Sequence, residues 1–238
     1  YLGLINQAKV FVNRNTTPML DALSKEGISP LLIWTKRAGN GDTFSAQEWL
    51  EGQVISTEEI GQRNDVVDVL YSLHHSKNLI QMLEKIGGEI VTPQMMLADY
   101  ENALPQPVAS NRFLKLVLHY LKTHVPTFDE KDKAVVHGDV NYKNWLVCRH
   151  YLYLVDWDSI MFSDPCVDVG TFLGHYRPKS AWNSWLLSYG MMPTSENLEK
   201  VYWYALLSLL QEVKKYYNRG DFDRMNDGIT QLKRIFSD

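Results

Sequence analysis

Two short polar segments in the middle of the chain contain the residue types that phosphoryl transfer requires. Residues 137–144 read HGDVNYKN, and residues 155–158 read VDWD. A phosphoryl donor such as ATP carries dense negative charge, and the Mg²⁺ that neutralises this charge prefers carboxylate and amide oxygens as ligands. The pattern therefore predicts that Asn144 and Asp156 bind a magnesium ion.

Two further carboxylates in these segments have predicted roles. Asp139 precedes Asn144 on the same loop, where it can accept the proton of an acceptor hydroxyl, so we predict that it is the catalytic base. Asp158 follows Asp156 by two residues, and on an extended segment both side chains project to the same side. We therefore expect Asp158 to add a carboxylate near the metal or the acceptor. His137 is expected to pin the loop by hydrogen bonding, because a zinc site would need more ligands.

The alternative interpretation is that both segments are ordinary surface turns, since Gly, Asp and Asn are common where chains reverse. Their order, their spacing and the apolar runs around them favour a functional site. These short runs predict strands over residues 134–137, 145–148 and 152–156. Each polar residue of interest then falls on a loop or at a strand end.

The remaining pattern predicts an α+β protein. Alternating apolar residues and turn signals predict strands over residues 8–15, 31–36 and 43–48, with a helix from residue 16 to about 26. Apolar residues at helical spacing predict helices over residues 57–73, 78–86, 93–104, 109–124, 182–189, 196–217 and 222–236. The change from sheet to helix predicts a lobe boundary near residues 49–52.

Composition narrows the class of protein. The 238 residues are 45% apolar, and the formal net charge of -4 with a pI near 6.0 gives no basic surface for nucleic acid. The chain has two cysteines, and its pattern indicates neither a secretion signal nor a membrane span. We expect a cytoplasmic protein, and no protein partner is indicated. Because the chain starts at Tyr1 within a sheet-like pattern, we expect some N-terminal sequence to be absent.

In its two polar segments the chain resembles the aminoglycoside phosphotransferase and choline kinase family, whose signature is a His-Gly-Asp loop followed by Asn and then an Asp-Trp or Asp-Phe segment. Asp168 is similar to an Asp that braces the family's catalytic loop. The resemblance implies a protein-kinase-like, two-lobed fold. Residues 1–52 would form a β-rich nucleotide-binding lobe and hinge, incomplete here, and residues 53–238 a mainly helical catalytic and acceptor-binding lobe. It also implies ATP, or another nucleoside triphosphate, as donor and Mg²⁺ as cofactor.

The resemblance also places the hinge between the lobes at residues 45–52, which read SAQEWLEG. Backbone groups around Glu48, Trp49 and Leu50 would there hydrogen-bond the adenine of the donor. Trp49 can equally be a core residue, which is the commoner fate of a tryptophan.

The chain departs from the family at the position of a phosphate-binding lysine. The family carries this lysine on the third strand of its nucleotide lobe, whereas Asn13 stands there in this chain, with Lys9 and Arg14 as weak substitutes. Because Asn13 lacks the positive charge of a lysine, we expect weaker binding of the phosphoryl donor. Two loop residues, Asn141 and Lys143, face either the transferred phosphate and acceptor or simply solvent.

Aromatic residues of the C-terminal helices allow two interpretations. They can form a cage for a quaternary amine, or they can fill the core, which is the favoured interpretation for aromatics at helical spacing. The residues concerned are Trp182, Trp185, Tyr189, Tyr202, Trp203, Tyr204, Tyr216 and Tyr217.

The leading hypothesis is a Mg²⁺-dependent phosphotransferase that moves the γ-phosphoryl group of ATP to a hydroxyl of a small metabolite. A sugar, a nucleoside or an amino alcohol is implied by the resemblance, and a pentose or nucleoside is preferred. The rival hypothesis is a catalytically weakened kinase-fold protein with a regulatory or binding role. Asn13 supports this rival, and the intact trio of Asp139, Asn144 and Asp156 opposes it. Metal-dependent phosphate-ester hydrolysis is a third hypothesis, but it needs a water nucleophile and usually more ligands.

Overall fold

The computed structural model describes residues 1–5 and 8–237. These residues form two compact units, and each unit is built from two separate stretches of the chain. The first unit contains residues 1–89 and 134–162, and the second contains residues 90–133 and the chain from Ser163 onward. The lobe boundary predicted between residues 52 and 53 does not coincide with a boundary of these packing units, and it stays a prediction.

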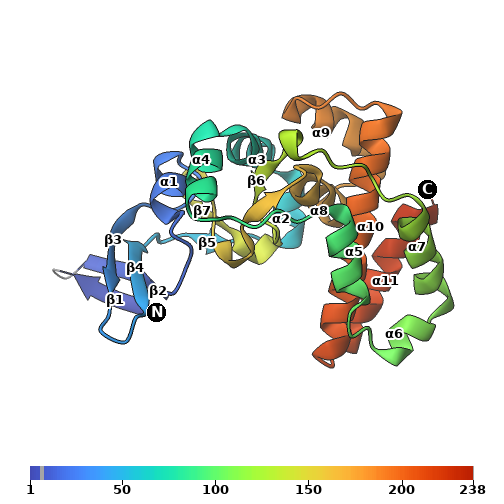
Figure 1. Cartoon of the computed structure of the whole chain (residues 1–238), viewed down its shortest axis with the longest axis horizontal. Helices are drawn as coiled ribbons and strands as arrows, with labels where there is room; N and C mark the ends of the chain where they lie inside the picture. The colour runs from blue at the N-terminus through green and yellow to red at the C-terminus, as the bar shows by residue number, and fades with distance from the viewer. Residues whose placement is uncertain (6–7, 238) are drawn as a thin grey trace. The chain divides into compact units, whose positions relative to one another are not determined.

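A four-stranded antiparallel sheet forms one part of the first unit (Figure 1, blue). Its strands, in spatial order, are β1 (Leu2–Ile5), β2 (Ala8–Arg14), β4 (Thr43–Glu48) and β3 (Leu32–Arg37). The three strands predicted after residue 8 are therefore confirmed. Between β3 and β4 the Ala38 N–H donates to the Asp42 carbonyl oxygen at 2.7 Å. Gly41 supplies the positive φ of 92° that this turn requires.

Short strands and helices complete the first unit. Along the chain they are α1 (Leu20–Lys25), β5 (Gln53–Val54), α2 (Thr57–Gln62), α3 (Asp65–His75), α4 (Lys77–Lys85), β6 (Ala134–Val136), β7 (Trp145–Cys148), β8 (Tyr151–Leu154) and β9 (Met161–Ser163). β7 pairs with β5 on one side and β8 on the other, β6 pairs with β9, and α3 packs against β6 and β8. The apolar runs around the polar segments are thus strands, as predicted.

The single helix predicted over residues 57–73 is wrong, because it breaks at Arg63. The backbone of Arg63 is extended, with ψ at 132°, and its Nε donates to the Asp65 carboxylate at 2.9 Å. Asp65 stands in the first turn of α3, where the helix dipole favours an anion. The ion pair therefore starts a second helix instead of continuing the first.

Helices dominate the second unit. They are α5 (Pro93–Glu101), α6 (Gln106–Ser110), α7 (Arg112–Thr123), α8 (Cys166–Tyr176), α9 (Trp182–Tyr189), α10 (Ser195–Asn218) and α11 (Phe222–Ser237), with 3₁₀ turns at Glu130–Asp132 and Lys179–Ala181. α10 packs against α5, α7, α8 and α11, and Figure 1 shows α10 and α11 side by side in orange and red. Within the described residues no helix is both long and apolar enough to cross a membrane.

Two features of the second unit differ from the expected pattern. The helix predicted over residues 109–124 begins only at Arg112, because the Asn111 side chain accepts the N–H groups of Phe113 and Leu114 and caps α7. The helix α8 is absent from the predicted elements. Its residues are buried over most of its surface rather than along one stripe, so the sequence has little of the amphipathic spacing that marks a surface helix.

Core packing is confirmed for most of the C-terminal aromatic residues. Five of the eight are buried, and they are Trp182, Trp185, Tyr189, Trp203 and Tyr204. The Trp203 indole N–H also donates to the Leu121 carbonyl oxygen at 2.9 Å. These rings therefore hold helices together within the second unit.

Close packing of α8 on α10 gives a stability prediction. A Cβ added at Gly170 would lie 2.7 Å from both the Tyr204 Cβ and the Val201 carbonyl oxygen. Because α10 is packed on several sides, we expect Gly170→Ala to lower the free energy of unfolding by about 1–3 kcal/mol in urea denaturation. Gly39→Ala is the control, since nothing lies within 4 Å of a Cβ there. Equal urea midpoints for the two variants would contradict the close approach.

Candidate active site

His137 joins the two polar segments of the first unit. Its side chain is fully buried, with Nε2 3.0 Å from the Val155 carbonyl oxygen and Nδ1 3.2 Å from the Asp139 backbone nitrogen. Because the Asp139 N–H is a donor, Nδ1 accepts, and the Nε2–H is assigned as the donor to Val155. The predicted role of His137 in pinning the loop is confirmed.

Gly138 allows the sharp turn between His137 and Asp139. Its φ is +79°, and a Cβ at this position would lie 2.8 Å from the carbonyl oxygen of Ser159. Ser159 ends the 3₁₀ turn Trp157–Ser159 of the second polar segment. Glycine therefore serves both the backbone conformation and the close approach of the two segments.

Asn144 closes the loop that starts at Asp139, at the end of the 3₁₀ turn Tyr142–Asn144. The Asn144 side-chain nitrogen donates to the Asp139 backbone carbonyl oxygen at 2.8 Å, and the Asn144 backbone carbonyl oxygen accepts the Val155 N–H at 2.9 Å. The side chain is only 8% exposed. Its amide oxygen accepts no hydrogen bond from any residue that the structure describes, so this oxygen is available to a ligand.

The second polar segment turns sharply at Asp156, which has left-handed backbone angles of φ 66° and ψ 69°. Such angles are uncommon for a residue other than glycine and are found often at functional sites. Trp157 anchors the turn, because its buried indole N–H donates to the Leu154 carbonyl oxygen at 3.1 Å. The extended geometry expected for this segment is wrong, since Asp158 lies in a 3₁₀ turn.

Three acidic side chains in these segments form no ion pair with the residues that the structure describes. The carboxylates of Asp139, Asp156 and Asp158 form neither a hydrogen bond nor an ion pair within the part of the chain that the structure describes. Carboxylates that have no partner within the protein are available to bind a cation. The backbone around them is held by the hydrogen bonds of His137 and Trp157.

The chemistry of these oxygen donors fits magnesium. No group of three or more His, Cys, Asp and Glu side chains that could hold a metal ion occurs among residues 1–5 and 8–237. Mg²⁺ does not need such a group, because one or two carboxylates, phosphate oxygens and water complete its shell. Asn144, Asp156 and Asp158 offer one amide oxygen and two carboxylates, which matches that requirement.

A cavity of about 620 Å³ opens within the first unit, a size typical of small-molecule sites. The predicted site residues that line it are Glu48, Trp49, Leu50, Asn144, Asp156 and Asp158. The structure thus brings the predicted hinge and the three predicted metal ligands to one cavity. Asp139 is not in its lining, and it is tied to the cavity wall through its hydrogen bond with Asn144.

The residues of the predicted hinge differ in what they can offer a ligand. The Glu48 N–H already donates to the Leu31 carbonyl oxygen at 2.9 Å, and the Glu48 carboxylate accepts the Leu31 N–H at 3.0 Å. Trp49 is 38% exposed, so the interpretation of Trp49 as a core residue is wrong. Its ring lies 5.9 Å from the Lys9 ammonium nitrogen.

Sequence reasoning placed Asn13 at the phosphate position, but it assigned neither Phe11 nor Gln47 to the site, and all three line the cavity. Phe11 and Asn13 line it from one face of β2, and Gln47 lines it from β4. The Asn13 side-chain nitrogen lies 3.4 Å from the Gln47 side-chain oxygen, and Gln47 donates to the Pro30 carbonyl oxygen at 2.9 Å. The alternation of strand residues could have placed Phe11 beside Asn13, since positions i and i+2 share a face.

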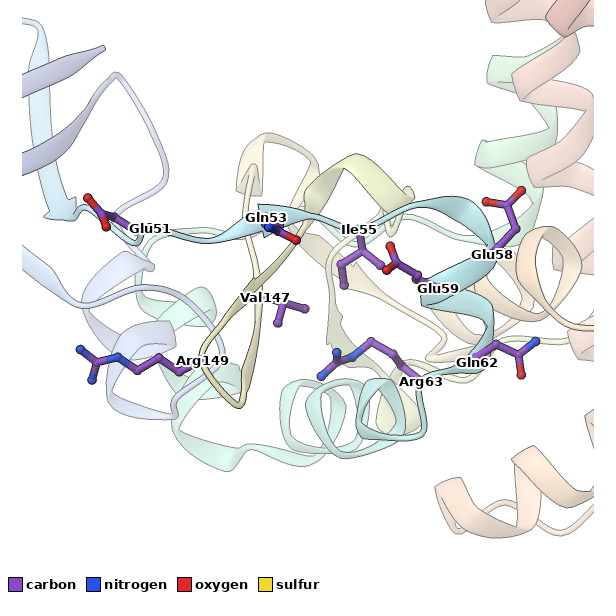
Figure 2. Close-up of a pocket in the computed structure, with 9 residues that line it drawn as sticks. All are labelled: Glu51, Gln53, Ile55, Glu58, Glu59, Gln62, Arg63, Val147 and Arg149. Carbon is purple, nitrogen blue, oxygen red and sulfur yellow. The ribbon is translucent and has the colours of Figure 1, made fainter.

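A second hollow of about 610 Å³ on the first unit has a different chemistry (Figure 2). Two of its charged residues serve local structure. The Glu59 carboxylate and the Ser56 side chain form a reciprocal cap at the start of α2, and Arg63 pairs with Asp65. Figure 2 shows Arg149 at the β7–β8 turn, with its side chain directed away from α2. We assign no catalytic role to this hollow.

Comparison with known proteins identifies the family. A sequence profile described as the phosphotransferase enzyme family matches residues 14–204, a stretch that contains the hinge and both polar segments. The chain belongs to this phosphotransferase enzyme family. Its fold is that of solved protein-kinase-like enzymes, and both the α+β fold and the family resemblance predicted from the sequence are confirmed.

Three solved structures illustrate the likeness. The aminoglycoside phosphotransferase APH(2″)-IIIa with GDP and kanamycin is 14% identical, with 92% of this chain and 81% of that chain covered and a TM-score of 0.66. The choline kinase LicA from Streptococcus pneumoniae is 17% identical, with coverage of 98% and 88% and a TM-score of 0.66. A choline/ethanolamine kinase family protein from Mesorhizobium loti is 16% identical, with coverage of 100% and 88% and a TM-score of 0.67.

Asp168 of this phosphotransferase lies in the second unit. It is buried in the first turn of α8, two turns from Tyr176 at the end of that helix. Its role in bracing the catalytic loop, which the family resemblance implies, stays a prediction.

The two hydrogen bonds of His137 generate a prediction. We expect His137→Phe to lower the free energy of unfolding by about 2–4 kcal/mol, because the Val155 carbonyl and the Asp139 N–H lose their partner in a buried site. The measurement is urea denaturation. His150→Phe, at an exposed position in the β7–β8 turn, is the control and should change stability by less than about 0.5 kcal/mol. A His137→Phe protein as stable as the control would contradict the bridging role.

Proposed function

We propose that this phosphotransferase is a Mg²⁺-dependent kinase that transfers the γ-phosphoryl group of ATP, or of another nucleoside triphosphate, to a hydroxyl of a small metabolite. The observation that carries the proposal is the shared cavity of the first unit, lined by the hinge and by three oxygen donors. Relatives of similar fold bind nucleotides, since one was solved with GDP and LicA was solved with AMP. In this proposal residues 1–52 provide the nucleotide-binding lobe and hinge.

The hinge end of the cavity suits the base of the donor. Phe11, Leu50 and Leu146 offer apolar walls around a flat ring. Because the Glu48 N–H is committed to Leu31, the backbone of Leu50 or its neighbour Trp49 supplies the hydrogen bond to the base. The phosphates then extend toward the polar segments.

The polar end of the cavity suits the triphosphate and its metal. Asn144 and Asp156 would hold the magnesium ion, and Asp158 would add a carboxylate at the same wall. When bound there, magnesium would supply neutralisation of the negative charge on the donor phosphates. Asn144 is well suited to this role, because its amide nitrogen is fixed to the Asp139 backbone and its oxygen is left for the ion.

Asp139 would act on the acceptor. As the acceptor oxygen forms its bond to the γ-phosphorus, the bond from that phosphorus to the β–γ bridging oxygen breaks, and the hydroxyl proton passes to the Asp139 carboxylate. The backbone of Asp139 is fixed at both ends, since its N–H donates to His137 and its carbonyl oxygen accepts from Asn144. The backbone from which the carboxylate projects is therefore fixed before the substrate arrives.

The acceptor class that we propose is a sugar, a nucleoside or an amino alcohol. Residues 53–238 would provide the acceptor-binding part of the enzyme. Relatives named for an aminoglycoside complex and for choline show that this fold accommodates different acceptors, so a panel of small hydroxyl compounds is the direct way to find the substrate.

Substitution of the proposed base tests the mechanism. The protein is incubated with ATP, Mg²⁺ and the acceptor panel, and ADP formation is measured. We expect Asp139→Asn to lower kcat about 10²–10⁴-fold, with little change in ATP affinity, because the amide cannot accept the proton. Asp158→Asn should have a smaller effect than Asp156→Asn on the Mg²⁺ concentration needed for half-maximal rate. If Asp139→Asn leaves acceptor turnover unchanged, Asp139 is not the catalytic base.

One observation supports the rival proposal of a weakened regulatory or binding protein. Asn13 lines the cavity and bonds to Gln47, so the strand offers an uncharged amide where the family has lysine. Under the rival proposal the protein binds a metabolite or nucleotide without turning it over, and the acceptor panel yields no ADP above the Asp139→Asn background.

A further inference from the structure

We propose that Lys143 supplies the positive charge for the donor phosphates that Asn13 cannot supply. The inference rests on the proposed donor site in the first unit and names a donor-binding residue within it. The phosphate-binding cation would thus have moved from the strand to the loop that carries Asn144.

The charges around the cavity show why the donor phosphates need a cationic side chain. Three acidic residues, Glu48, Asp156 and Asp158, line it. Within the part of the chain that the structure describes, the lining contains two cations, Arg14 and Lys143. A triphosphate brings several further negative charges, and the ion held by the aspartates offsets only part of the total. A free cationic side chain is therefore needed beside the phosphates.

Arg14 is already committed to a neighbouring carboxylate. Its guanidinium lies 2.8 Å from the Asp42 carboxylate, which also accepts hydrogen bonds from Asn15 at 2.8 Å and Asn40 at 2.7 Å. The hydrogen bond from Asn15, followed by those from Asn40 and Arg14, lowers the pKa of Asp42. Asp42 therefore stays ionised at neutral pH and offsets the charge of Arg14.

Lys143 is held in place without being neutralised. Its backbone N–H donates to the Asn141 side-chain oxygen at 3.1 Å, which fixes the 3₁₀ turn from which the side chain leaves. Its ammonium lies 5.6 Å from the centroid of the Tyr142 ring. It forms no ion pair with the described residues. An aromatic face attracts the cation but leaves its full charge and its three donors for an anion.

The position of Lys143 also matches the geometry that the donor requires. Lys143 directly precedes Asn144, so the cation and a proposed metal ligand share one rigid turn. Lysine is a compact charge on a flexible stem and can follow a phosphate without a bidentate fit. The sequence did not decide whether Asn141 and Lys143 face phosphate and acceptor or solvent. In the structure, Asn141 shapes the turn, and Lys143 lines the cavity.

Titration calorimetry of purified variants with Mg-ATP and with adenosine tests the inference. We expect Lys143→Met to weaken Mg-ATP binding about tenfold or more, because a charge-assisted contact is lost, and to leave adenosine binding within about twofold. Lys143→Arg should retain most of the affinity. Lys36→Met is the matched control, since Lys36 also rests on a ring, 5.2 Å from the Trp34 centroid, but does not line the cavity.

A second lysine at the family's usual position provides a rescue. Asn13→Lys in the Lys143→Met background should restore at least half of the lost Mg-ATP binding energy, that is, about threefold or more in affinity. The same change in the otherwise unaltered protein should bring a smaller gain, because Lys143 already contributes the charge. Arg14→Met should cost less affinity than Lys143→Met.

The outcomes separate this inference from the proposed function. If Lys143→Met leaves Mg-ATP binding unchanged, the role of Lys143 is overturned and the kinase proposal stands. The same holds if Arg14→Met weakens Mg-ATP binding more than Lys143→Met does. An equal loss of adenosine and Mg-ATP binding in Lys143→Met would also overturn it, since the residue would then be structural. If the unaltered protein binds no nucleoside triphosphate, both the inference and the proposed function fail.

Discussion

The bridge made by the His137 imidazole is the interaction on which the candidate site depends. One ring nitrogen accepts the Asp139 N–H and the other donates to the Val155 carbonyl. These two backbone groups belong to different polar segments, so a single buried ring sets the spacing between a proposed base and a proposed metal ligand. The bridge works only with a neutral ring, because an imidazolium has no lone pair to accept the Asp139 N–H.

Other contacts around this bridge act in the same direction. Gly138 allows the segments to approach, Asn144 ties the loop to its own start, and Trp157 holds the turn that presents Asp156. Each contact uses a backbone group as partner. The carboxylates of Asp139, Asp156 and Asp158 are thereby left without partners among the described residues. Their negative charge is uncompensated until a cation binds.

Local patterns in the sequence were enough to predict the polar loops and β2, β3, β4, β6, β7 and β8, but they did not predict the short strands β1, β5 and β9. The two polar segments were found because their spacing along the chain is itself the signal. The hinge was placed only by the resemblance to the family, and it stays a prediction. The break at Arg63 and the start of α7 at Arg112 were missed, since they depend on an ion pair and a cap that interrupt an otherwise continuous apolar pattern. The left-handed turn at Asp156 was missed as well, because the Trp157 ring packs on the His137 ring, with 4.6 Å between the centroids, and this long-range contact is not visible in the local pattern.

The interleaved chain path of the first unit also orders events during synthesis. The sheet that carries Asn13 is contiguous in sequence, whereas β5 pairs with β7 only after about ninety further residues. Closing so long a loop costs conformational entropy and slows folding. A nascent chain emerging from the ribosome can therefore form early the cavity wall that we propose for the nucleobase. It gains the wall proposed for the phosphates only when the segment from Lys143 to Asp158 has left the exit tunnel.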